Sequence, residues 1–198
     1  MMNARAFLEK INAKLLWLIF FSSLVLTFLF ISVLFPPFLA QFLPTGFGLN
    51  EFKFAWTKER MDAIISAWNS YDPGLIETMK MVHVVDFFFM GAYGFMLWSG
   101  LVIIYRFARN NKCIQKFFYL LTYLPFIAVV LDVIEGIHIF VMLGNPMQIM
   151  DFNAYSAALS TTICIWIINF CIIIFFIGLI IDLILFLKHR GTSKNGEP

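Results

Sequence analysis

The sequence has little charge, no dithiol motif and no sign of a nucleic-acid interface. Charged residues make up 13% of the 198 residues, against about 25% in a soluble domain. The absence of a basic stripe with interleaved aromatic residues argues against a nucleic-acid partner. Three cysteines without a C-x-x-C spacing favour neither a disulfide framework nor a redox site. Hydrophobic residues make up 61% and the mean hydropathy is +0.86, so lipid is the expected solvent and membrane lipids are the expected partners.

Four apolar segments are long enough to cross a hydrocarbon layer roughly 30 Å thick. They cover about residues 15–35, 81–105, 117–143 and 156–187. "FPP" at 35–37 predicts the end of the first, and "LGNP" at 143–146 and "KHR" at 188–190 predict the ends of the last two. We therefore predict an all-α fold: a four-helix transmembrane bundle forming one integral membrane domain over residues 1–190. Residues 191–198 read as a disordered tail.

The lysines and arginines predict the orientation. Ten of them precede the first segment, join the second to the third, or follow the fourth; the other four are spread along the loop of about 45 residues after the first segment. Positive residues concentrate on the cytoplasmic side. We expect a bacterial cytoplasmic (inner) membrane protein with both termini in the cytoplasm.

The long first external loop contains an amphipathic segment. Met61, Ile64, Ile65 and Trp68 recur at helical spacing after Thr57, a residue suited to cap a helix. Two interpretations remain open: a lid across the outer mouth of the bundle, or a helix lying in the headgroup layer.

Five ionisable residues lie inside the second and third apolar segments. With midpoints at residues 93 and 130, Asp86 and Glu135 fall roughly 10 Å and 8 Å outward of the membrane centre at 1.5 Å per residue. His83 and His138 fall about 12 to 15 Å outward by the same rise, and Asp132 lies nearer the centre. Because charge is costly in hydrocarbon, these side chains should point into the bundle and toward one another.

Three interpretations fit this group. It is a hydrogen-bonded plug between the two helices, a polar pocket for a small amphipathic or cationic ligand or for proton transfer, or a metal site. The metal site would use His83, Asp86, Glu135 and His138, because E-x-x-H spacing occurs in di-metal helix bundles and these ligands suit divalent zinc, iron or manganese. Ligand binding or proton carrying would rest on Asp86, Asp132 and Glu135, with the two histidines beside them.

Three smaller features bear on packing. Pro125 should kink the third helix. Gly91 and Gly94 indicate close helix packing in the second, and the Asn169 amide in the middle of the fourth is expected to bond a neighbouring helix.

The stretches "MKMVHVVDFFFM" and "LPFIAVVLDVIEGIHIF" resemble an uncharacterised family of small bacterial four-span integral membrane proteins. That family has an aspartate early in its second span and a proline followed by D-x-x-E in its third. Asp86, Pro125, Asp132 and Glu135 match this pattern, which does not include the histidines. The resemblance implies the fold and the polar site but no reaction.

The arrangement is also similar, more loosely, to the emopamil-binding and sigma-2 receptor group, in which acidic residues surround a pocket for sterol-like amines. The leading functional hypothesis is a buried acidic pocket in the outer half that binds a small amphipathic or cationic ligand or lipid. The alternatives are a structural protein whose polar cluster locks the helices, and a metal-dependent or isomerase-type membrane enzyme.

Overall fold

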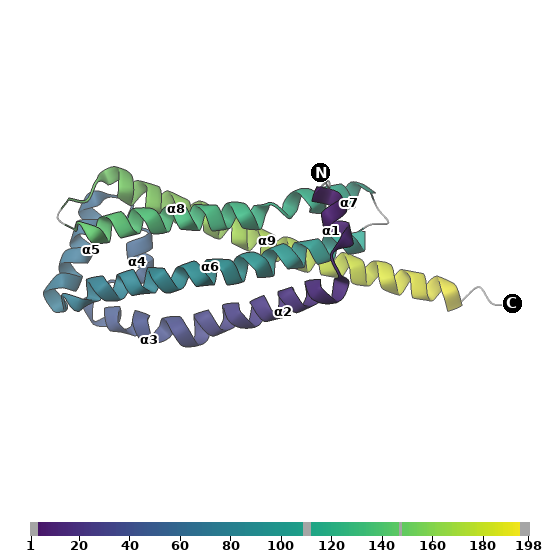
Figure 1. Cartoon of the computed structure of the whole chain (residues 1–198), viewed down its shortest axis with the longest axis horizontal. Helices are drawn as coiled ribbons and strands as arrows, with labels where there is room; N and C mark the ends of the chain where they lie inside the picture. The colour runs from purple at the N-terminus through teal and green to yellow at the C-terminus, as the bar shows by residue number, and fades with distance from the viewer. Residues whose placement is uncertain (1–3, 109–111, 147, 195–198) are drawn as a thin grey trace.

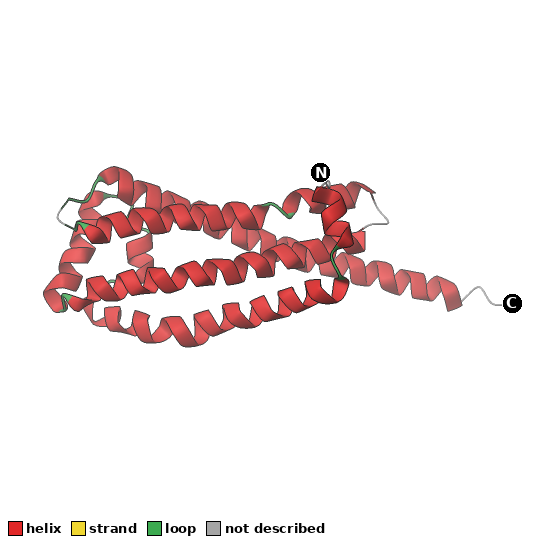
Figure 2. Cartoon of the chain, viewed as in Figure 1, coloured by secondary structure: helices red, strands yellow, loops and turns green. Residues whose placement is uncertain are grey.

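The computed structural model describes residues 4–108, 112–146 and 148–194, with side chains as far as residue 184. Its ordered elements over these residues are helices (Figure 2). Four helical segments are long and apolar enough to span a membrane: Ala13–Thr45, Gly74–Phe107, Lys112–Gly144 and Asp151–Ile184. The predicted all-α four-helix bundle is confirmed, and the composition and length of its helices are those of an integral membrane protein.

The first segment continues past the point where the sequence predicted its end. It consists of α2 (Ala13–Leu29), a π-helical turn (Phe30–Leu34), α3 (Phe35–Leu39) and a 3₁₀ helix (Ala40–Thr45). The prediction that "FPP" stops the helix was wrong, because the prolines lie in the first turn of α3. Backbone N–H groups in a first turn have no obligatory intrahelical acceptor, so proline costs little there. The segment ends instead at Gly46, whose φ of 76° is left-handed.

The second and third segments are α6 (Gly74–Phe107) and a pair of shorter helices, α7 (Lys112–Leu121) and α8 (Leu124–Gly144). Pro125 does more than kink the third segment: it lies in the first turn of α8, where the segment is divided into two helices. The predicted end near "LGNP" agrees with the end of α8.

The fourth segment is a single helix, α9 (Asp151–Lys194). "KHR" at 188–190 does not terminate it, and that prediction was wrong. Cations near a helix C-terminus interact favourably with the helix dipole, so they stabilise the helix rather than end it. Of the predicted tail 191–198, residues 191–194 belong to α9 and residues 195–198 lie outside the described residues.

The two ends of the bundle differ (Figure 1). α4 (Leu49–Lys53) and α5 (Lys58–Tyr71) lie at one end, and we call these two helices the cap. α1 (Ala4–Lys10), α7 and both chain termini lie at the other end. The first and last spans therefore both have their free ends on the side away from the cap.

The amphipathic stripe of the cap packs on the bundle. α5 begins after Thr57, whose Oγ1 accepts a hydrogen bond from Arg60 N at 3.3 Å. The predicted stripe is buried in one apolar cluster with side chains of α6 and α8: Met61, Ile64, Ile65 and Trp68 with Met79, Ile139, Met142 and Leu143. The stripe thus faces protein, as a lid across the bundle requires, rather than a headgroup layer.

Two glycines of α6 that look alike in the sequence differ in the structure. A Cβ on Gly94 would lie 2.7 Å from Val129 Cγ2 on α8, whereas a Cβ on Gly91 would meet nothing within 4 Å. Valine is stiff about χ1, so Val129 has little freedom to yield. Of these two glycines, Gly94 is the one that permits the close approach of α6 to α8, the two helices that carry the acidic residues.

We predict that Gly94→Ala destabilises the protein by roughly 1–3 kcal/mol, the usual cost of overpacking. Gly91→Ala on the same helix is the matched control and should be neutral or slightly stabilising, because alanine favours helix. Thermal unfolding of both variants in detergent measures the difference. Equal effects of the two changes would contradict the close approach described here.

Candidate functional site

A lysine from the cap enters the space between α6 and α8. Lys53 is the last residue of α4, and its side chain is 16% exposed. The preceding residue fixes its direction: Phe52 is fully buried, with its ring centroid 4.9 Å from that of Trp68 and 6.3 Å from that of His83. α4 is held at its start, where Gly48 N donates to Glu51 Oε2 at 2.9 Å. A five-residue helix is thereby anchored well enough to position one ammonium group.

The ammonium of Lys53 joins one carboxylate from each helix. Lys53 Nζ donates a hydrogen bond to Asp86 Oδ2 at 3.1 Å and lies 2.9 Å from Glu135 Oε1. The Asp86 and Glu135 side chains are 10% and 2% exposed. Glu135 Oε2 is buried and accepts no hydrogen bond from the described residues. The pair with Glu135 is therefore a close ionic contact that leaves part of the carboxylate's bonding capacity unused.

The charge of Lys53 is secured by this environment. Burial by itself lowers the pKa of an ammonium group, but the negative charges of Asp86, Glu135 and Asp132 outweigh it. Together they raise the pKa of Lys53 above its ordinary value of 10.5. Lys53 remains a cation throughout the physiological pH range.

Asp132 forms a second, deeper layer. It lies one helical turn from Glu135 on α8, and its Oδ2 accepts a hydrogen bond from the Tyr93 hydroxyl of α6 at 2.7 Å. Cys164 of α9 lies 3.7 Å from that hydroxyl and is 3.4 Å from the Ala128 carbonyl oxygen, to which its thiol can donate. α9 thus closes the polar region from the third side. We call Asp86, Asp132 and Glu135 the acidic cluster.

The two histidines are placed differently. His83 is buried, and its Nδ1 lies 2.9 Å from the Met79 carbonyl oxygen. A carbonyl can only accept, so Nδ1 carries the proton and Nε2 has a free lone pair, which no described residue engages. His138 is partly buried and faces α9, with its Nδ1 3.0 Å from Asn153 Oδ1.

The hypothesis of a metal site at His83, Asp86, Glu135 and His138 finds no support in this geometry. Over the residues with described side chains, no three His, Cys, Asp or Glu residues are grouped so as to hold a metal ion. The space between Asp86 and Glu135 is filled by Lys53, and His138 bonds to α9.

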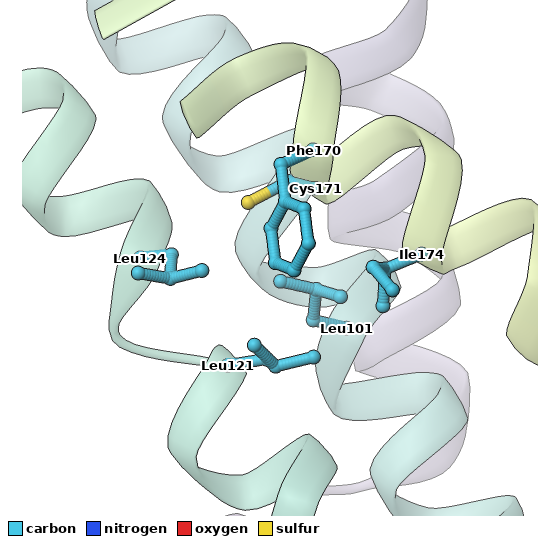
Figure 3. A pocket seen from close by; sticks show the side chains of 6 residues that line it. All are labelled: Leu101, Leu121, Leu124, Phe170, Cys171 and Ile174. Atoms are coloured by element: carbon cyan, nitrogen blue, oxygen red, sulfur yellow. The ribbon is translucent and has the colours of Figure 1, made fainter. Parts of the chain in front are cut away.

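A small apolar hollow lies elsewhere, at the break between α7 and α8 (Figure 3). It holds about 110 Å³ of empty space, open mouth included, and is lined by Leu101, Leu121, Leu124, Phe170, Cys171 and Ile174. None of these side chains carries a charge, and none belongs to the acidic cluster. The hollow offers an amphipathic ligand no acceptor.

The sequence predicted that the three acids point into the bundle, and all three are buried, but it did not predict which groups contact them. Lys53 was counted only among the four basic residues of the external loop, and Tyr93 was not singled out. A signal for Lys53 was present: in "FKF" a lysine stands between two phenylalanines, of which Phe52 is buried and Phe54 is 39% exposed. The spacing of Tyr93 in the sequence does not indicate its role, because its bond to Asp132 depends on the rotation of α6 against α8.

Comparison of the chain with protein-family models, with curated proteins and with solved structures finds no match. The resemblance to a bacterial four-span family therefore stays an expectation from the sequence.

We predict that Lys53→Met destabilises the protein by about 3 kcal/mol or more, because removing one partner of a buried ion pair leaves the other uncompensated. Adding Asp86→Asn and Glu135→Gln to the same chain should recover most of that loss. Chemical unfolding in detergent measures both.

The matched control is Lys58→Met, because Lys58 also pairs with a carboxylate, that of Asp62, but on an exposed face of the cap. Its effect should be far smaller. Equal losses for the two lysines, or no recovery in the triple variant, would show that the Lys53 ion pairs do not determine stability.

Proposed function

We propose that the acidic cluster binds the amine head group of a small amphipathic cation, with Asp86 and Glu135 as its acceptors. The observation that carries this proposal is the imbalance of charge. Asp86 and Glu135 both contact one ammonium, that of Lys53, and Asp132 adds a third acidic group one helical turn from Glu135, so among the described residues the acidic groups outnumber the cation that contacts them. In a membrane interior such an excess is costly and marks functional positions.

The position of Lys53 supports a primary amine as the ligand type. Its Nζ already contacts both carboxylates at ammonium distances, so the gap between α6 and α8 accepts a group of this size and charge. Lys53 belongs to the cap and not to a membrane helix. In this proposal it is a tethered counter-cation that an incoming amine displaces.

Aromatic rings near the gap support an apolar tail. Phe87 of α6 and Phe140 of α8 stack with centroids 6.1 Å apart, and the Phe87 ring lies against Gly136, 3.3 Å from where a Cβ would be. Phe87 is 37% exposed, so this wall faces the lipid. Aromatic faces also attract cations, and an amphiphile arriving from the bilayer would meet them first.

A second candidate function is a structural lock, in which the ion pairs only fasten the cap to the bundle. The filled space between Asp86 and Glu135 favours it. The two functions differ in what they predict once Lys53 is removed, since a lock gains nothing from an external amine.

We predict that Lys53→Ala binds dodecylamine at least about tenfold more tightly than the wild type does, equivalent to ~1.4 kcal/mol. The competing ammonium is gone and the carboxylates remain. Calorimetry of the protein in nanodiscs measures the affinity, and dodecanol, with the same chain but no charge, should show no such gain. Adding Glu135→Gln should abolish most of it. A lock without a binding site predicts equal amine affinity for Lys53→Ala and the wild type.

We also propose a bacterial inner-membrane location with both termini in the cytoplasm and the cap outside. The supporting observation is the distribution of lysine and arginine, ten against four, together with the placement of both termini at the end opposite the cap.

In this orientation a membrane-impermeant maleimide should label Cys113, which is exposed on α7, only after the cells are opened. Tyr71→Cys, at the exposed end of α5, should be labelled in intact cells when Cys113 is replaced by serine. Labelling of Cys113 in intact cells would reverse the proposed orientation.

A further inference from the structure

Asn169 presents a polar side chain to the membrane interior from the outer face of α9. It lies about 2 Å from the middle of the apolar segment Asp151–Ile184 at 1.5 Å per residue. Its side chain is exposed, and its Nδ2 donates to Ile165 O of the same helix at 2.9 Å. The expected bond to a neighbouring helix is not made among the residues that the structure describes.

An exposed amide at this depth has no water to complete its bonding. Nδ2 has a second N–H, and Oδ1 accepts no bond from the described residues. Leaving such groups unpaired in hydrocarbon costs free energy. By contrast, Ser22, an exposed hydroxyl residue of α2, is satisfied by donating to Leu18 O and Ile19 O. Asn169 therefore requires a partner from outside the chain.

The residues around Asn169 form a regular seam. Successive members alternate by four and three positions: Thr162, Trp166, Asn169, Ile173, Phe176 and Ile180. The four apolar members are 74%, 57%, 58% and 57% exposed in chain order. Each pair of steps covers seven positions, the spacing of a coiled-coil seam, and keeps one face toward a partner helix over about 27 Å. The buried residues Cys164, Cys171 and Gly178 lie on the opposite face of α9.

We propose that this α9 seam binds a second copy of the same chain, as a parallel two-fold pair centred on Asn169. Copies inserted in one direction place Asn169 at the same depth, so the two amides meet at the two-fold axis. A carboxamide both donates and accepts, so two of them are mutually complementary. Toward the C-terminus, α9 extends past the other helices (Figure 1). This proposal is independent of the amine site.

Energy transfer between labelled copies in liposomes, measured over a series of protein-to-lipid ratios, tests the pairing. Wild-type protein should associate above the random-proximity baseline. Asn169→Leu should weaken association about three- to tenfold, the range of interhelical polar contacts, and Asn169→Gln should retain most of it. Phe88→Leu, at a 69% exposed position of α6 away from the seam, is the matched control and should have no effect.

Cross-linking gives a second readout that does not depend on the strength of the amide pair. With Cys113 replaced by serine, Ile173→Cys should form a disulfide between copies, and Phe88→Cys should not. Monomeric wild-type protein at all ratios would overturn the proposal and leave lipid or another protein as the occupant. Unchanged association of Asn169→Leu, or cross-linking at Phe88→Cys alone, would also overturn it.

Discussion

The architecture depends on the compensation of buried carboxylates in a medium that cannot solvate them. Asp86 and Glu135 lie on different membrane helices, and the ammonium that contacts both comes from a third element, α4 of the cap. Because an unpaired charge is far more costly in hydrocarbon than a polar bond is favourable, this contact fixes three elements at once. The burial of Phe52 and Trp68 beside it makes the cap part of the bundle rather than a loose loop.

The sequence contains enough information for the spans and for the inward direction of the acids. Both follow from one local property, the cost of placing polar groups in lipid, and it acts on each residue separately. For the same reason the apolar stripe of α5 could be recognised residue by residue. The misjudged helix ends, at "FPP" and at "KHR", have another origin. Whether a proline or a cation ends a helix depends on its position within the helical turn. That position depends in turn on where the helix began.

The partners of the acids could not be predicted, because pairing across elements depends on rotation and on loop geometry. Lys53 lies 33 positions before Asp86 and 82 before Glu135, and only the burial of Phe52 directs it inward. The histidines show the same limit. His83 and His138 fall at similar computed depths, yet one bonds to its own helix and the other to Asn153 of α9. The depth of a residue in the membrane can be estimated from its position along the helix. The direction in which its side chain points around the helix axis depends on how the helices pack.

A structural lock needs fewer charged groups than this site contains. One lysine and one carboxylate would fasten the cap to a helix and leave no net charge, and the Tyr93–Asp132 bond could be replaced by a neutral pair at lower desolvation cost. Instead three acidic groups lie near the one ammonium that the described residues bring to the cluster, and Glu135 Oε2 and His83 Nε2 are buried without a described partner. Unused acceptors around an excess of negative charge provide sites for a donor that carries positive charge. In the function proposed above, an arriving amine supplies both properties at once.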